Sequence, residues 1–360
     1  MTSSFEILRN KFDKHDMFGT LVKFHEDLEN ALQRYYTKSL PRRISVNGST
    51  IYYDNFNKIL FIGMGGSAIG GHIISSYLND KVSIPLLVSR NFNIPGFVDS
   101  RTLVIAVSYS GNTDETLTAV NEIIKRKAPL VVITSNGMLE KRAKELFIPY
   151  FLLPRGYLPR TSIGYMLIAI LQILNEYEVF SFPLNEVKEA IEKIKEQSYI
   201  YLENPLSTSS YKLAHTISNK IPLIYSYPPY TPIGFRFKTQ LNENAKMHAF
   251  FGELPEVNHN EIMGFEQLNS SNYHVVFIEG TEKSYNMKIR LEFWYKLLKE
   301  KEVGYDIVTG MGISRLANML TLMYQLDFTS YFAALIRGVD PSPVTTISEL
   351  KQYVKNRTIK

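Results

Sequence analysis

The chain contains no cysteine, and it has no apolar run long enough to cross a membrane as a helix. The first absence excludes disulfide bonds, thiolate nucleophiles and cysteine-based zinc or iron–sulfur sites. The longest apolar stretch, residues 162–174, is well short of the ~20 residues that a membrane span requires. The N-terminal residues also lack the apolar core of a secretory signal. We therefore expect a soluble, cytoplasmic protein without a membrane partner, in which 162–174 forms a buried helix.

A concentrated block of basic residues is missing as well. The 360 residues include 40 Lys and Arg and 35 Asp and Glu, so the formal net charge of +5 is spread along the chain. Proteins that bind nucleic acid usually gather their basic residues on one face, so we expect no nucleic-acid partner. A solvated surface that tolerates anionic substrates is the favoured interpretation.

Metal-binding patterns are absent too. The seven histidines form no H-x-x-x-H pair and no tight cluster with Asp or Glu. Two histidines on one helical turn, or such a cluster, would be typical of a metal-dependent isomerase. We therefore expect no metal, and no other cofactor is indicated.

The chain does contain apolar, β-branched runs that alternate with helix-length segments. Such alternation predicts an α/β fold with parallel sheets covered by helices on both faces. The runs fall into two groups, which predicts two domains. The first group is 58–65, 84–89, 102–108, 129–135 and 148–154, and the second is 221–227, 273–280 and 305–310.

Proline and glycine punctuate the region between these groups, and two helical patterns, 161–177 and 185–198, lie within it. A further helix is predicted at 282–301. No close sequence repeat is present, so any duplication is architectural. The division predicted is an N-terminal helical segment at 1–40, a first domain at 41–154, a helical bridge at 155–204, and a second domain with C-terminal helices at 205–360.

The glycine-rich loop GMGGSAIGG, residues 63–71, leaves a predicted strand and enters a helix. Its glycines would let backbone N–H groups approach an anion at the helix N-terminus, and Ser67 would add a hydroxyl donor. Two alternatives stay open. A glycine turn can serve tight packing alone, and Gly63, Gly65 and Ala68 fit the dinucleotide pattern G-x-G-x-x-G/A. The next strand ends without the acid that NAD requires, although Arg90 could suit NADP.

A second loop, SYSGNTDET at 108–116, again joins a strand to a helix. It places three hydroxyl side chains, those of Ser108, Ser110 and Thr113, around one glycine. Hydroxyls beside a helix N-terminus suit a phosphate monoester without a metal. The alternative is local, because Asn112 followed by Glu115 resembles a capping box.

A carboxylate and an imidazole follow sixteen positions apart, Glu243 in QLNENAK and His259 in PEVNHNE. A carboxylate base and an imidazole suit proton transfer on a phosphorylated metabolite. Glu243 lies in a predicted helix that starts near Gly234. The competing interpretations are a solvated helix carboxylate for Glu243 and a structural hydrogen bond for His259.

Taken in order, these motifs resemble the bifunctional phosphoglucose/phosphomannose isomerases of archaeal and bacterial type, which are built from two sugar-isomerase (SIS) domains. The resemblance runs from about residue 58 to the C-terminus. It rests on GMGGSAIGG, SYSGNTDET, LPRTSIGY (158–165), QLNENAK, LPEVNHNE (254–261) and GVDPSPV (338–344). His72 departs from the family, in which an aspartate is common at that position.

The resemblance implies a fold class and a set of site residues. The fold would be α/β, with two SIS-type domains, each a parallel sheet flanked by helices. The residues that would hold the sugar phosphate are Gly66, Ser67, Ser108, Ser110 and Thr113.

Four further residues would carry the chemistry. Arg160 would stabilise an enediolate, Glu243 would move the proton between C1 and C2, His259 would assist ring opening, and Lys351 would contribute from near the C-terminus. From the residues alone, Arg160 could be a surface arginine and Lys351 a solvated helix lysine.

The activity implied is interconversion of glucose 6-phosphate and mannose 6-phosphate with fructose 6-phosphate, a reaction of glycolysis and gluconeogenesis, without metal or nucleotide. Family members typically work as homodimers, with the histidine supplied across the subunit interface. Two alternatives remain: a non-catalytic SIS-type sugar-phosphate sensor, which would need neither Glu243 nor His259, and an isomerase restricted to glucose 6-phosphate.

Overall fold

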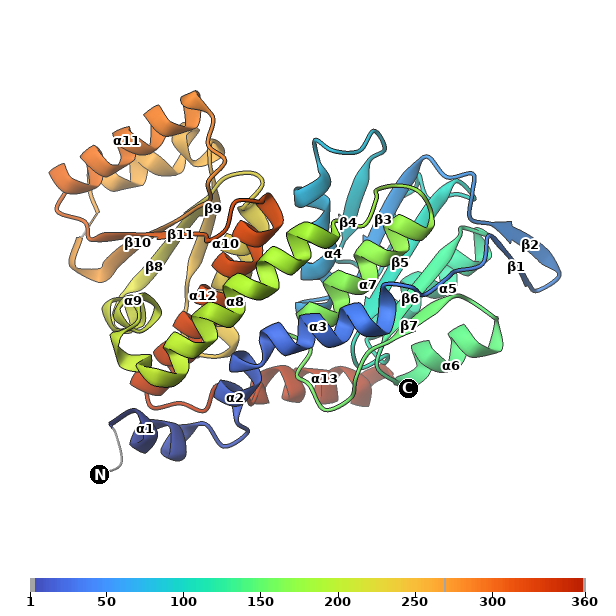
Figure 1. Ribbon diagram of the computed structural model, residues 1–360, viewed down its shortest axis with the longest axis horizontal. Helices are drawn as coiled ribbons and strands as arrows, with labels where there is room; N and C mark the ends of the chain where they lie inside the picture. Colours follow the sequence, from blue (N-terminus) through green and yellow to red (C-terminus); the bar gives the residue numbers. More distant parts are fainter. Residues whose placement is uncertain (1–3, 269, 359–360) are drawn as a thin grey trace.

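Two parallel sheets, joined by long helices, form the framework of the computed structural model, which describes residues 4–268 and 270–358 (Figure 1). The first sheet has the order β4-β3-β5-β6-β7 and the second has the order β11-β10-β8-β9. The first consists of β3 (Lys58–Ile62), β4 (Leu86–Ser89), β5 (Thr102–Ser108), β6 (Leu130–Thr134) and β7 (Tyr150–Leu152). The second consists of β8 (Ile221–Ser226), β9 (Phe250–Glu253), β10 (Tyr273–Glu279) and β11 (Tyr305–Thr309). The predicted fold class, two domains with parallel sheets flanked by helices, is confirmed.

The first sheet is buried on both faces because its strands are apolar at successive positions. In β3, Ile59 and Phe61 join the apolar cluster that includes α4 (Gly66–Leu78) and α7 (Ile163–Glu176). The intervening Leu60 and Ile62 join a separate cluster with α5 (Asp114–Lys125) and α6 (Gly137–Glu145). This alternation follows the two-residue period of a strand.

In the second sheet, the connections through α10 (Thr231–Glu243) and α11 (Tyr285–Glu300) lead to opposite edges. Because crossovers between parallel strands are right-handed, the two helices cover opposite faces. On the α11 face, the fully buried ring of Trp294 packs on Tyr225 and Phe277. On the other face, α10 packs against α12 (Arg315–Ile336), which also contacts α9 (Ser209–Ile217).

The two sheets share one apolar core. A continuous cluster runs from β3 through α4, α7, α10 and α12 to β10. The long helix α8 (Leu184–Glu203) crosses between the two sheets in Figure 1 and contacts both α3 (Phe24–Tyr35) and α12. Near the N-terminus, α1 (Ser4–Phe12) and α2 (Met17–Val22) place Phe5 and Phe18 against aromatic rings of α12. The domains are therefore held together by helices rather than by a flexible linker.

Most predicted elements form close to their expected limits, and the stretch 162–174 is buried within α7. Two features were not predicted: the hairpin β1 (Arg43–Val46) with β2 (Ser49–Tyr52), and the edge strand β9. The C-terminal helix α13 (Thr345–Thr358) leaves apolar side chains such as Leu350 exposed. The remaining elements of the described residues are short 3-10 helices: η1 (Pro205–Ser207), η2 (Glu256–His259), η3 (Glu261–Glu266) and η4 (Ser270–Asn272).

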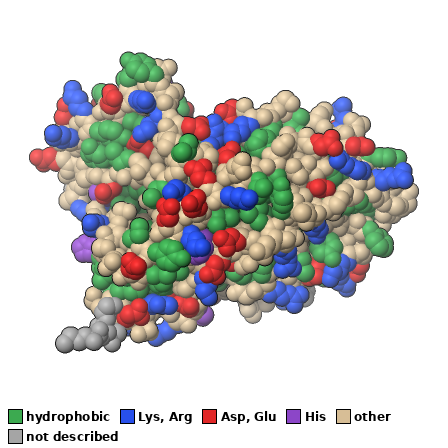
Figure 2. Space-filling view, viewed as in Figure 1, with side chains coloured by type: hydrophobic (Ala, Val, Ile, Leu, Met, Phe, Trp, Pro, Cys, Tyr) green, Lys and Arg blue, Asp and Glu red, His purple; other side chains and the backbone are tan. Residues whose placement is uncertain are grey.

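The surface agrees with the scattered charge of the sequence. On the face seen in Figure 2, acidic and basic side chains are interspersed rather than gathered into a patch of one sign. Among the helices of residues 4–268 and 270–358, none has the length and apolar character needed to span a bilayer.

Candidate functional site

The two predicted phosphate loops lie side by side at the carboxyl edge of the first sheet. One joins β3 to α4, and the other joins β5 to α5. The connections through α4 and α5 lead to opposite sides of the β3–β5 pair, so the two loops flank the point where the strand order reverses. Open α/β sheets bind ligands at such a switch point.

A hydrogen bond connects the two loops, and two further contacts lie within the second loop. The hydroxyl of Ser67, on the first turn of α4, accepts a hydrogen bond from the backbone N–H of Tyr109 at 3.2 Å. Ser108 Oγ lies 2.9 Å from Thr113 Oγ1, and Ser110 Oγ accepts from the N–H of Asn112 at 3.3 Å. The structure thus brings Ser67 next to the loop that carries the other three hydroxyls.

The capping interpretation of Asn112 is wrong. The residue that caps α5 is Thr113, and no side chain hydrogen-bonds to the helix from that position. The Asn112 Oδ1 instead accepts from the N–H of Met138, in the first turn of α6. Gly111, with φ +65°, makes this loop possible, because a Cβ there would lie 1.8 Å from the carbonyl oxygen of Asn136.

Arg90, which could bind the phosphate of NADP according to the sequence, contacts an imidazole and an aromatic ring. Its guanidinium Nη2 lies 3.1 Å from His72 Nδ1, and its guanidinium carbon lies 5.2 Å from the centre of the Phe235 ring. Burial, assisted by Arg90, lowers the pKa of His72 to about 4. Arg90 therefore bridges α4 and α10.

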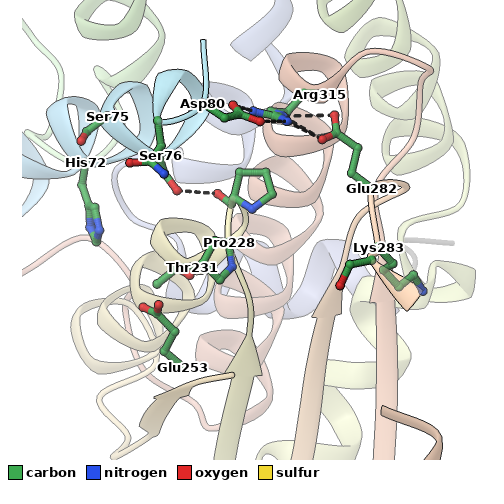
Figure 3. A pocket seen from close by; sticks show the side chains of 13 residues that line it. His72, Ser75, Ser76, Asp80, Pro228, Thr231, Glu253, Glu282, Lys283 and Arg315 are labelled. Carbon is green, nitrogen blue, oxygen red and sulfur yellow. Dashed lines mark hydrogen bonds and ion pairs between the residues drawn. The ribbon is translucent and has the colours of Figure 1, made fainter. Parts of the chain in front are cut away.

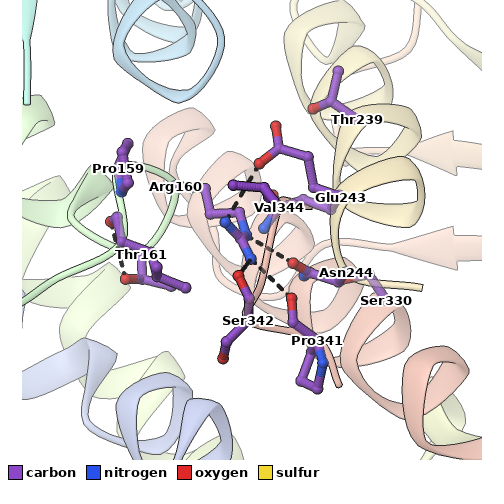
Figure 4. Close-up of polar contacts among 12 residues, drawn as sticks. Pro159, Arg160, Thr161, Thr239, Glu243, Asn244, Ser330, Pro341, Ser342 and Val344 are labelled. Carbon is purple, nitrogen blue, oxygen red and sulfur yellow. Dashed lines mark hydrogen bonds and ion pairs between the residues drawn. The ribbon is translucent and has the colours of Figure 1, made fainter. Parts of the chain in front are cut away.

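Arg160 is the centre of a buried polar group (Figure 4). Its Nε donates to Asn244 Oδ1 at 2.7 Å, and its Nη2 donates to the carbonyl oxygens of Pro341 and Ser342 at 2.8 and 2.9 Å. Its Nη1 lies 3.4 Å from Glu243 Oε2. Burial lowers the pKa of Arg160, and the carboxylate of Glu243 opposes that shift. With a side chain only 3% exposed, Arg160 is not a surface arginine.

The phosphate loops and Arg160 are neighbours. A Cβ added to Gly66 would lie 3.1 Å from backbone atoms of Arg160, so the N-terminus of α4 packs directly on the loop before α7. Glu243 is the last residue of α10, and its side chain is 26% exposed. Three elements from different parts of the chain therefore converge: a phosphate loop, a buried arginine and a carboxylate that solvent can reach.

A second layer of residues fixes this arrangement. Asn244, 1% exposed, accepts from Arg160 and donates to Ser330 Oγ of α12 at 2.9 Å. The guanidinium of Arg236 donates to both carboxylate oxygens of Asp327 and to the backbone carbonyl of Arg160. Sequence reasoning missed these residues. The only signal was a dense run of polar residues around Glu243, which does not reveal which side chains turn inward.

Lys246 was also missed. Its Nζ donates to the carbonyl oxygens of Glu243 at 2.7 Å and Asp340 at 2.8 Å, and so ties the end of α10 to the segment before α13. Burial, assisted by the charge of Arg160, lowers the pKa of Lys246 to about 8.

His259 and Lys351 lie outside this group. His259 ends η2 and is exposed, and Lys351 is exposed on α13. Within the described residues, neither side chain has a hydrogen bond or ion pair with Arg160 or Glu243. Their roles stay predictions.

Among the residues that the structure describes, no group of three or more His, Asp or Glu side chains is arranged so that it could hold a metal ion.

Comparison with known families identifies both halves of the chain. Residues 52–144 match the family model of the SIS domain, and residues 207–354 match that of the bacterial phospho-glucose isomerase C-terminal SIS domain. The solved structure of a hypothetical protein from Thermus thermophilus has the same fold, with a TM-score of 0.74 over 98% of this chain and 93% of that chain, at 15% identity.

Curated relatives are closer in sequence. The bifunctional phosphoglucose/phosphomannose isomerase of Aquifex aeolicus is 37% identical over 83% of this chain and 91% of its own length. That of Caldicellulosiruptor bescii is 32% identical over 93% and 98%. A D-glucosamine-6-phosphate 4-epimerase of Sulfolobus acidocaldarius is 33% identical over 74% and 84%. On these identities and coverages, the chain belongs to the family of bifunctional phosphoglucose/phosphomannose isomerases.

Proposed function

We propose that this protein is an aldose–ketose isomerase that interconverts glucose 6-phosphate and mannose 6-phosphate with fructose 6-phosphate. The family supports the activity and its sugar-phosphate substrates. The observation that carries the proposal at the level of residues is the 3.4 Å contact between Arg160 Nη1 and Glu243 Oε2, beside the phosphate loops. A cation, a carboxylate and an anion-binding loop are the groups that this isomerisation requires.

The proposed reaction proceeds through an enediolate. In the open-chain aldose, Glu243 takes the proton from C2, and the electrons of the C2–H bond form the C1–C2 double bond while charge develops on O1. Arg160 stabilises this charge. The proton then returns from Glu243 to C1, and C2 becomes the ketose carbonyl as the O2 proton passes to O1. Both epimers give the same planar intermediate, so one site can serve glucose and mannose 6-phosphate.

The phosphate is assigned to the two loops of the first sheet. Backbone N–H groups of the first turn of α4 at Gly66 and Ser67, with the hydroxyls of Ser108, Ser110 and Thr113, would bind it. The hydrogen bond between the two loops, the contact of Ser108 with Thr113 and the N-termini of α4 and α5 support this assignment.

His259 and Lys351 are assigned by family resemblance. In this proposal the chain is a homodimer, and His259 serves ring opening at the site of the partner copy, which agrees with its exposure on η2. Lys351 acts from α13, which begins three residues after the Ser342 carbonyl that contacts Arg160. The proposed domains are 41–154 and 205–360, joined by 155–204 and preceded by the helical segment 1–40.

Subunit complementation tests the shared site. Glu243→Gln and His259→Asn homodimers should each be nearly inactive, whereas a refolded mixture should regain activity because some heterodimers contain one intact site. No recovery in verified heterodimers would contradict a histidine supplied by the partner.

The activity itself is tested by turnover of purified protein on glucose 6-phosphate and mannose 6-phosphate separately. The first stage contains EDTA, and metal for the coupling enzymes is added afterwards. Activity on both epimers is the expected result, and activity on glucose 6-phosphate alone would indicate a restricted isomerase. Binding of sugar phosphate without turnover would indicate a sensor. Glucosamine 6-phosphate belongs in the same assay, because one relative is named as an epimerase of that sugar phosphate.

A further inference from the structure

Helices α4 and α10 pack against each other and run in opposite directions. Each has 13 residues and follows the first strand of its parallel sheet, β3 or β8. Ser76 Oγ donates to the carbonyl of Pro229 at 2.9 Å, and the rings of His72 and Phe235 are 6.3 Å apart. Later residues of α4 therefore meet earlier residues of α10. The candidate active site lies at one end, where α4 begins and α10 finishes.

The opposite end has the same topological setting. In the second sheet, α10 leads from β8 to β9 and α11 leads from β10 to β11, in opposite directions. The carboxyl ends of β8 and β10 therefore form a second switch point, where a ligand site is expected in an open α/β sheet. The structure has a cavity of about 640 Å³ at this place, closed on one side by the second half of α4 (Figure 3). We call it the β8–β10 pocket.

An arginine with carboxylate partners is found at both ends. Arg160 precedes α7, the helix that follows the first sheet in the sequence, and it contacts Glu243 at the end of α10. Arg315 begins α12, the helix that follows the last strand of the second sheet, and contacts Asp80 just after the end of α4. Arg315 also forms three hydrogen bonds to Glu282, at 3.1, 3.0 and 2.5 Å. The β8–β10 pocket thus resembles the candidate active site in architecture.

Its chemistry is different, because it is not built for phosphate. Where the first site has a glycine-rich turn, the loop after β8 contains Pro228 and Pro229, which have no N–H to offer. Within the described residues, no glycine of the loops after β8 and β10 has a positive φ. The loop after β10 carries the carboxylate of Glu282 beside Lys283 and Ser284, and that carboxylate repels an anion.

Negative charge is in excess in the pocket. Asp80 and Glu282 share the single guanidinium of Arg315, and Lys283 is paired with Glu279. Glu253, which ends β9 and points into the pocket, has no ion pair among the described residues (Figure 3). Glu253 is an exposed residue, and partial burial raises the pKa of its carboxyl while the neighbouring Thr231 hydroxyl opposes that shift. A cationic ligand would give this carboxylate an ion pair.

A buried hydroxyl beside Glu253 is also incompletely bonded. Thr231 lines the pocket and is only 7% exposed, and its Oγ1, which is closed off from solvent, makes no hydrogen bond of regular geometry. The hydroxyl is still close enough to Glu253 to oppose the rise in the pKa of that carboxyl. Buried polar atoms usually find a partner, so an unsatisfied hydroxyl in the pocket wall marks a place where Glu253 and Thr231 together can bind a polar ligand. Asn79 and Ser284 add further polar groups to the lining.

We propose that the β8–β10 pocket binds a small organic cation that bears an ammonium group and hydroxyl groups, with Glu253 as the counter-charge and Thr231 as a hydrogen-bond partner. Amino sugars and amino polyols belong to this class. The proposal concerns a second site and does not depend on the isomerase activity.

Glucosamine and glucose are suitable probes, because they differ by an ammonium group in place of one hydroxyl and neither carries phosphate. Calorimetric titration of the full chain at pH 7 should show glucosamine binding about ten-fold more tightly than glucose, as expected for one charge-assisted contact. Equal affinity for the two sugars would overturn the proposal.

Variants then locate the binding. Glu253→Gln keeps the shape of the side chain and should lower the affinity for glucosamine by about ten-fold. The matched control is Glu256→Gln, an exposed carboxylate on η2 outside the lining, which should change the affinity less than about two-fold. Thr231→Val is the second variant and should also lower the affinity for glucosamine. Thermal unfolding checks that this variant keeps its fold. Unchanged affinity in both pocket variants would show that the cation binds elsewhere.

Discussion

The two ends of the α4–α10 pair show how one architecture can carry two chemistries. Both lie at the carboxyl edge of a parallel sheet, at a point where the strand order reverses. At the first end, glycine and serine loops place N–H and hydroxyl groups beside two helix N-termini. At the second end, the corresponding loops carry two prolines and the carboxylate of Glu282 beside Lys283 and Ser284. The topology therefore provides a site at each end, and loop composition decides the charge of what it can bind.

The two arginines differ in the same instructive way. Arg160 is buried and donates to one amide and two carbonyl oxygens, so its charge is only partly balanced by Glu243. Arg315 is surrounded by two carboxylates, which raise its pKa. The positive charge of Arg160 therefore remains available to a developing anion. The charge of Arg315 is balanced by its two carboxylate partners, and its contacts connect α4, α12 and the loop after β10.

The largest effect is expected at Glu243. Glu243→Gln should lower the turnover of glucose 6-phosphate by roughly 10²–10⁴-fold, because a lost general base typically costs that much. Binding of fructose 6-phosphate should change little, since the phosphate loops are intact. Steady-state kinetics and calorimetry measure the two quantities.

Glu300→Gln is the matched control, because Glu300 also ends a helix of the second domain but lies outside both sites. It should retain wild-type turnover. If Glu243→Gln were as active as Glu300→Gln, the base would have to be another group. The end of the helix pair at Glu243 would then not be distinguished by a catalytic carboxylate.

The sequence predicted the fold and the phosphate loops well, for a physical reason. Strand interiors such as 103–107 are buried on both faces and are therefore apolar at every position. Their short length and β-branched content distinguish them from buried helices. The loops combine glycines, several of which close packing requires, with hydroxyls such as Ser108 and Ser110 that capping does not require. Helix α10 and the position of Glu243 within it could also be expected from pattern and resemblance.

The second layer could not be predicted in this way. Asn244 and Glu243 are adjacent and both polar, yet one is fully buried against α12 and the other reaches solvent. The difference depends on contacts with residues 84 and 86 positions away, Arg160 and Ser330. Edge strand β9 was missed for a similar reason, because only its neighbour β8 reveals its pairing.

The second largest effect is expected from the buried ion pair behind the site. Asp327→Ala leaves the guanidinium of Arg236 buried without its carboxylate, and such unpaired buried charges cost about 3–5 kcal/mol. Asp80→Ala, at the other end, should cost only about 0–1 kcal/mol, because the Asp80 side chain is 62% exposed and Glu282 still pairs with Arg315. Urea unfolding of both variants measures the difference. Equal losses would mean that both ends depend on their ion pairs alike.

A glycine comparison within the phosphate loops gives a smaller effect. Gly111→Ala should cost about 3 kcal/mol of stability, because φ is +65° and the new Cβ would lie 1.8 Å from the carbonyl oxygen of Asn136. Gly65→Ala meets φ +50° with ψ −124°, but nothing lies within 4 Å, so only backbone strain of about 1–2 kcal/mol is expected. Denaturation midpoints of the two variants decide the matter. A costlier Gly65→Ala would show that backbone strain, not steric closeness, sets the demand for glycine.

The smallest effect concerns His72, whose pKa is lowered to about 4 by burial and by the charge of Arg90. Between pH 6.5 and 4 the unfolded chain binds a proton at this position and the folded chain does not, so acid weakens the fold. His72→Gln should therefore lose less stability than wild type between pH 7 and pH 5, by on the order of 2 kcal/mol. Parallel pH curves for the two proteins would contradict this. A neutral His72 at pH 7 leaves Glu253 without a cation from α4, so the same measurement bears on whether the β8–β10 pocket keeps its excess of negative charge.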